Sequence, residues 1–236
     1  MNLFKPIYIS LLFRNILPWC STICILLFII GMISSLFFSP EDYKQGDIVK
    51  IMYLHVPSAW LALIIYGLMA IFSLMTLVWH NSIASILAHA AAPAGTFFSA
   101  ICLITGSIWG KGTWGTWWVW DARLTSMLIL FFMYIGYLAL WNAFNNDLRA
   151  EKSAAVFNIF SAINIPITKF SVNLWSTLHQ SSSIIRQDGI AIQGSLLIPL
   201  IIMFMFYITF FLVVWILYSL YLINMYKIKR EINMRY

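Results

Sequence analysis

Tryptophan is concentrated in one short segment of the sequence. Five tryptophans lie between Trp109 and Trp120, and glycines occupy positions 110, 112 and 115. One or two tryptophans would be explained by the aromatic belt that forms at membrane interfaces. Five, among glycines that permit tight turns, favour a flat aromatic platform for a large planar apolar ligand, with the belt as the alternative. The candidate platform residues are Trp114, Trp117, Trp118 and Trp120.

Two of the four histidines are placed to bind a metal within such a ligand. His55 comes just before one long apolar stretch and His179 just after another, so the alternation of spans brings both to the face that carries the tryptophans. Imidazole is a common axial ligand of haem iron. The pair and the platform together predict a haem site, although each histidine alone would more simply be an interfacial residue. His80 and His89 fall on the opposite side and receive no ligand role.

Haem also carries two propionates, which need cations. Arg123 is the preferred partner because it adjoins the tryptophans, and an arginine fork matches a carboxylate. Its alternatives are an ion pair with Asp121 or a side chain that only reaches water. Asp121, in turn, either holds a histidine ring or caps the helix that follows. The other cations predicted on this face are Lys50, Lys111 and Arg186.

Membrane-spanning helices must position these residues. Of the 236 residues, 62% are hydrophobic and 9% charged, whereas soluble domains have about 45–50% and about 25%. A bilayer takes about 20 apolar residues to cross. We predict an all-α polytopic membrane protein, a single domain over residues 1–236 with an external tryptophan-rich loop at 109–123. The six predicted spans are 16–38, 56–79, 86–110, 124–141, 154–178 and 194–226.

Charge predicts the orientation of these spans. With the N-terminus inside, the inner segments hold eight Lys and Arg residues and the outer loops five, together with five acids. The positive-inside rule therefore places both termini in the cytoplasm. The net charge of +6 comes from span ends and not from a long basic stretch, which argues against nucleic-acid binding. The first apolar run is too long for a signal-peptide core and is expected to stay as an anchor.

Two polar residues, Asn164 and Lys169, stand out within a predicted span. A permease that conducts a substrate through its bundle would need more of them, so this alternative has thin support. Lys169 lies nine residues from the outer end of its span, on the order of 14 Å deep. Intramembrane charge usually faces protein or water, so we expect this lysine to reach outward or to pair with another subunit.

Residues 114–126 (WGTWWVWDARLTS) resemble the WWD signature of haem-handling membrane proteins. Within that superfamily the chain is similar to the CcmC family, haem exporter protein C of system I cytochrome c maturation. Residues 50–60 (KIMYLHVPSAW), 165–172 (IPITKFSV) and 175–180 (WSTLHQ) carry the resemblance further. The family's two external histidines fall on His55 and His179.

The resemblance implies that the protein binds haem b as a substrate, with these histidines as axial ligands, and delivers it to the membrane-anchored haem chaperone CcmE. It also implies association with the ABC transporter subunits CcmA and CcmB and with the small subunit CcmD. The membrane would be the bacterial inner membrane or a mitochondrial one. The sequence has no phosphate-binding loop and no catalytic triad, which favours a positioning role without a covalent nucleophile. A permease subunit and a structural transporter subunit without haem are the alternatives.

Overall fold

The computed structural model describes residues 5–144, 146–175, 179 and 192–233, and the regular structure within them is helical. Six helical segments of this part are long and apolar enough to cross a bilayer. The predicted all-α class with six spans is therefore confirmed. The elements are α1 (Pro6–Phe37), the 3-10 helix η1 (Asp47–Ile51), α2 (Met52–Trp79), α3 (Ser82–Trp114), α4 (Ala122–Ala143), α5 (Asp147–Ser161), α6 (Asn164–Leu174) and α7 (Gly194–Asn233).

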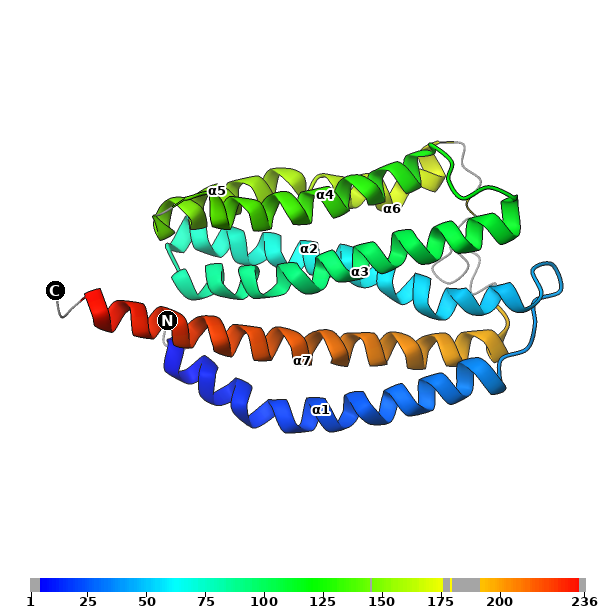
Figure 1. Ribbon diagram of the computed structural model, residues 1–236, viewed down its shortest axis with the longest axis horizontal. Helices are drawn as coiled ribbons and strands as arrows, with labels where there is room; N and C mark the ends of the chain where they lie inside the picture. Colours follow the sequence, from blue (N-terminus) through cyan, green and yellow to red (C-terminus); the bar gives the residue numbers. More distant parts are fainter. Residues whose placement is uncertain (1–4, 145, 176–178, 180–191, 234–236) are drawn as a thin grey trace.

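The helices form a bundle of three tiers (Figure 1). α2 and α3 pack on each other in the middle, α1 and α7 pair along one side, and α4, α5 and α6 cover the other. α1 begins and α7 ends at the same end of the bundle, which we call the proximal end. The opposite, distal end holds the α1–η1 and α3–α4 connections and the start of α7. This alternation is the one that six spans require, with His55 at the distal start of α2.

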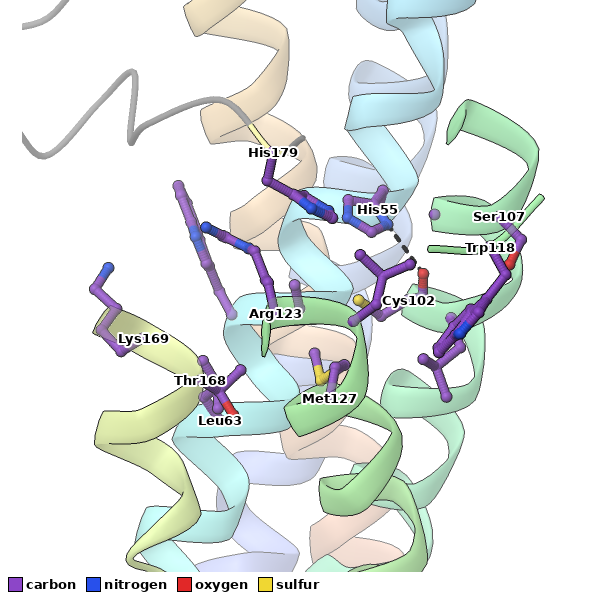
Figure 2. Close-up of a pocket in the computed structure, with 15 residues that line it drawn as sticks. His55, Leu63, Cys102, Ser107, Trp118, Arg123, Met127, Thr168, Lys169 and His179 are labelled. Atoms are coloured by element: carbon purple, nitrogen blue, oxygen red, sulfur yellow. Dashed lines mark hydrogen bonds between the residues drawn. The ribbon is translucent and has the colours of Figure 1, made fainter. Parts of the chain in front are cut away.

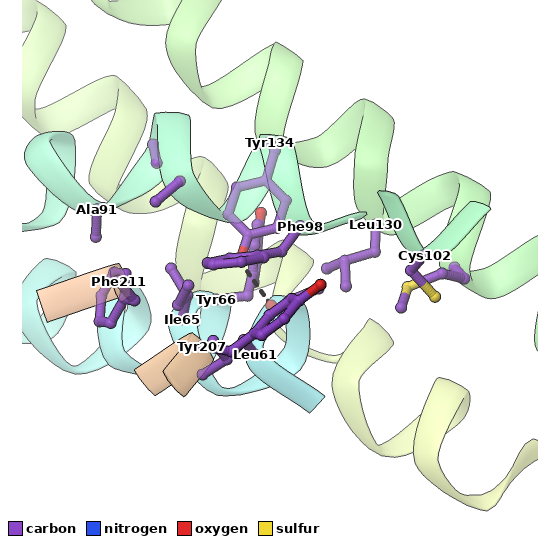
Figure 3. Packing of buried hydrophobic residues seen from close by; sticks show 14 of the residues in the cluster. Leu61, Ile65, Tyr66, Ala91, Phe98, Cys102, Leu130, Tyr134, Tyr207 and Phe211 are labelled. Atoms are coloured by element: carbon purple, nitrogen blue, oxygen red, sulfur yellow. Dashed lines mark hydrogen bonds between the residues drawn. The ribbon is translucent and has the colours of Figure 1, made fainter. Parts of the chain in front are cut away.

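Small residues let the two central helices approach closely. The buried side of α3 is rich in alanine, and at Gly95 a Cβ atom would collide with the ring of Tyr134. Tyr134 fills this gap from α4 and donates its hydroxyl to the carbonyl oxygen of Ala62 on α2 at 2.6 Å (Figure 3). Close contact through small residues is the usual way that helices associate in membranes. The result is a well-packed core beneath the distal end.

The fifth span consists of two helices, α5 and α6, and is not continuous over the predicted residues 154–178. Pro166 has no N–H to donate, and its ring conflicts with the carbonyl four residues earlier, at Ala162. Helix α5 accordingly ends before Ala162, and α6 begins at Asn164. The Asn164 amide donates to the carbonyl oxygen of Ser126 on α4 at 2.9 Å, so this polar side chain fastens the break to a neighbouring helix.

Helix α3 is longer than predicted and takes in the first part of the expected loop 109–123. Its added turn packs on η1, where a Cβ at Gly112 would collide with Ile48. The helix ends at Trp114 and is followed by Gly115, whose φ of 78° is the left-handed conformation in which glycine commonly terminates helices. Of the three glycines expected to permit turns, Gly115 alone lies in one.

Candidate functional site

A pocket lies at the distal end between α2, α3, α4 and α6, with His179 at its rim (Figure 2). It encloses about 720 Å³ of empty space, part of it open to the surroundings. Ligand pockets typically combine apolar walls with a few polar groups. The polar and charged side chains that line this one are His55, Cys102, Ser107, Trp118, Arg123, Thr168, Lys169 and His179.

The ring of His55 is fixed by the neighbouring helix α3. Its Nδ1 lies 3.0 Å from the carbonyl oxygen of Cys102 and 3.2 Å from the hydroxyl of Thr105. A carbonyl only accepts, so Nδ1 carries the proton and Nε2 keeps the lone pair that can bind a metal. A Cβ at Gly106 would come within 2.9 Å of the ring, so glycine is needed there. Trp109 meets the ring edge-on, with centroids 5.6 Å apart.

His179 is held by Asp121. Its Nδ1 lies 3.2 Å from Asp121 Oδ2, while Asp121 Oδ1 accepts from the backbone N–H of Leu124 at 2.8 Å. The two roles between which the sequence left Asp121 undecided are thus both filled, one by each oxygen. Trp114 packs on the histidine ring at 4.8 Å between centroids. Burial lowers the pKa of His179 and the positive charge of Arg123 lowers it further, against the raising effect of Asp121. These effects together favour the neutral imidazole, which is the form that binds a metal.

The rings of His55 and His179 point toward one another at the distal side of the pocket (Figure 2). One ring comes from α2 and the other from the segment that follows α6, so they converge although they are far apart in sequence. Each is oriented through Nδ1, which is the arrangement common among metal-binding histidines. The structure brings the predicted pair together, and the binding of iron by these rings stays a prediction.

The four platform tryptophans take different positions. Trp118 lines the pocket, and its indole N–H is buried without a hydrogen-bond partner in the described chain. Trp114 supports His179 from outside the lining. Trp117 and Trp120 are 58% and 76% exposed and lie outside the pocket lining. Trp60, which lines the pocket five residues after His55, was missed because a lone tryptophan in an apolar helix gives no distinctive signal.

Two cations line the pocket, and the sequence singled out one of them for this role. Arg123 faces the pocket as expected, and no ion pair joins it to Asp121 in the described part of the chain. Lys50 pairs with Asp47 at 2.6 Å, and Lys111 donates to a backbone carbonyl. Arg186 lies outside the described residues. The second cation of the pocket is Lys169, which the sequence suggested only as an interaction site.

These features fit haem as a substrate. Two imidazoles with anchored Nδ1 atoms suit an iron, a buried indole N–H and two cations suit carboxylates, and the remaining walls are mostly apolar. Comparison with known proteins bears on the same point. The family model described as "Heme exporter protein C", CcmC, matches residues 1–234. The chain belongs to the heme exporter protein C family.

Relatives of this family cover most of the chain. Heme exporter protein C of Bradyrhizobium diazoefficiens is 48% identical over 203 residues, which are 86% of this chain and 77% of the relative. Its Escherichia coli K12 counterpart is 44% identical over 172 residues, 73% of this chain and 70% of the relative. A putative cytochrome c biosynthesis ccmC-like mitochondrial protein of Marchantia polymorpha is 47% identical over 170 residues, 72% of each chain. The resemblance inferred from the motifs is confirmed.

Proposed function

We propose that this protein binds haem b in the distal pocket, with His55 and His179 as axial ligands, and delivers it to a haem chaperone during c-type cytochrome maturation. Membership of the heme exporter protein C family implies a role in haem export and cytochrome c maturation. The convergence of two oriented imidazoles in one pocket is the observation that carries the proposal.

The protein acts here as a positioning device. The Cys102 carbonyl and the Asp121 carboxylate each hold one Nδ1–H, so Nε2 is the atom of each ring that would bind the iron. Arg123 neutralises a propionate, and the Trp118 N–H is a further donor toward the substrate. The chaperone would take the haem covalently, as the family resemblance implies, while this chain orients the haem and contributes no covalent nucleophile.

The partners and the orientation belong to the same proposal. The receiving chaperone is CcmE, and the complex includes CcmA, CcmB and CcmD, as the family resemblance implies. Both termini lie in the cytoplasm and the distal end faces the periplasm of a bacterial inner membrane. Support comes from the charge bias: Lys152 and Lys229, for example, belong to the proximal segments that carry more basic residues.

The ligand assignment is tested by replacing both rings. We expect His55→Ala, His179→Ala to lose the visible absorption of bis-histidine haem when the full-length protein is purified in detergent. His80→Asn is the matched control, because His80 lies at the proximal end and its φ of 49° is a conformation that asparagine tolerates. Undiminished haem and an unchanged spectrum in the double variant would refute the ligand role. A subunit that only scaffolds a transporter would show no chromophore even before mutation.

A further inference from the structure

Among the described residues, the ionised side chains that line the distal pocket are both cations. Arg123 and Lys169 line it, and no aspartate or glutamate of the described residues does so. Arg123 comes from the start of α4, whereas Lys169 comes from α6. A pocket lined by two separate cations is suited to a ligand with two anionic groups.

Lys169 lies closer to the end of its helix than the sequence suggested. Helix α6 ends at Leu174, five residues further on, which corresponds to about 7.5 Å along the axis. A lysine side chain is long enough to carry its ammonium most of that distance. Figure 2 shows the side chain at the edge of the pocket, with its ammonium directed toward the end at which His179 lies.

Within the described residues, the ammonium of Lys169 has no protein counter-ion. The ion pairs of the described residues join Lys50 to Asp47, His179 to Asp121 and Lys229 to Asp147, and none includes Lys169. The residue is exposed, yet it belongs to a segment able to span the membrane. Charge in such a segment is costly and marks a functional position unless something compensates it. A ligand carboxylate at the pocket edge would be that compensation.

We propose that Lys169 binds the second carboxylate of the porphyrin, while Arg123 binds the first. The pocket thereby selects porphyrins with both carboxylates free over those in which they are masked. This inference rests on the proposed function, because it concerns the same site and the same substrate. It assigns a ligand-recognition role to Lys169, and it does not depend on which residues bind the iron.

The experiment compares two ligands in four forms of the full-length protein in nanodiscs. Haem and haem dimethyl ester, which lacks both negative charges, are titrated into the wild type, Lys169→Met, Lys169→Arg and Lys44→Met. Lys44 is the matched control, because it is an exposed distal lysine that does not line the pocket. We expect Lys169→Met to weaken haem binding by about three- to tenfold, because the substitution removes one partly exposed ion pair. Its effect on the ester should be small.

Lys169→Arg should restore the preference for haem over the ester, and Lys44→Met should match the wild type. The inference is overturned if Lys169→Met binds haem as tightly as the wild type, or weakens both ligands equally. In those outcomes an unchanged bis-histidine spectrum leaves the proposed function intact, and a role for Lys169 in contact with another subunit takes the place of this one. Absence of any haem binding by the wild type would refute both proposals.

Discussion

At the scale of single residues, Asp121 joins two tasks that are usually separate. One carboxylate oxygen caps the first turn of α4, and the other holds the ring of His179. The start of a helix and the orientation of a candidate iron ligand therefore depend on the same side chain. Because α4 also carries Arg123, the cation and the imidazole are held in a fixed relation to each other.

Replacing Asp121 by asparagine separates these two tasks. Asparagine caps helices about as well as aspartate, so we expect unchanged thermal unfolding. Without the negative charge that orients and polarises His179, haem affinity should fall by about tenfold or more, as it does when the partner of a metal-binding histidine is removed. Affinity is measured by haem titration of the purified full-length protein.

Asp42→Asn is the matched control for this substitution. Asp42 is a distal aspartate that accepts two backbone N–H bonds in a turn and has no contact with a histidine. Its replacement should leave haem affinity unchanged. Equal affinities in Asp121→Asn and the wild type would show that the carboxylate does not support ligation.

Much of the residue-level site could be predicted from sequence. Parity of the spans identified His55 and His179, and proximity to the tryptophans identified Arg123. Lys169 was placed nine residues from the end of its helix instead of five, because the end of α6 could not be located in a continuous apolar run. The exposure of Trp117 and Trp120 was not predictable either, since it depends on how the α3–α4 connection turns after Gly115.

At the scale of elements, two boundaries decide the shape of the pocket. The extension of α3 to Trp114 places this tryptophan on His179, and the same helix holds Cys102, Thr105 and Gly106 beside His55. The interruption before α6 gives Lys169 a helix of its own. Apolar length located the spans well, but contacts between helices set these two ends, and a single sequence does not contain them. Pro166 could be recognised in the sequence as a helix breaker. The position of the break along the chain also depends on the hydrogen bond from Asn164 to α4.

A glycine tests the role of α3 as a support for His55. In Gly106→Ala the new methyl group would come within 2.9 Å of the imidazole and push it off the Cys102 carbonyl. We expect weaker haem binding together with unchanged or slightly higher thermal stability, because alanine favours helix over glycine by about 1 kcal/mol. Haem titration and thermal unfolding measure the two effects.

Gly67→Ala on α2 is the control for this substitution, because its methyl group would make only an ordinary contact of 3.7 Å with Ile165. Gly67→Ala should have the same small effect on thermal stability and no effect on haem affinity. If Gly106→Ala binds haem normally, the ring of His55 does not need the space that the glycine provides.

At the scale of the whole molecule, the number of spans was predictable because each one must hide its backbone from lipid within a helix. The order of the tiers was not, since α1 and α7 are distant in sequence and nothing in their composition specifies that they pair. The orientation in the membrane stays a prediction from charge. It determines on which side of the membrane the pocket receives its substrate.

Thiol labelling in spheroplasts tests that orientation. A membrane-impermeant maleimide should modify Lys44→Cys in intact spheroplasts, and Lys152→Cys only after permeabilisation, because these exposed residues belong to the distal and proximal ends respectively. The unsubstituted protein gives the background from its native cysteines, of which Cys24 and Cys102 are buried. Labelling of Lys152→Cys in intact spheroplasts would show that the topology is the reverse of the proposed one.

The two candidate iron ligands are held by different parts of the fold. His55 is built into the continuous helix α2 and locked by α3, whereas His179 stands outside the helices, on the Asp121 carboxylate and the Trp114 ring. Displacing His55 would disturb the packing of α2 on α3, whereas His179 lies outside the described helices. We expect haem transfer to begin at His179. The acceptor's own ligand would replace His179 at the iron while His55 stays bound.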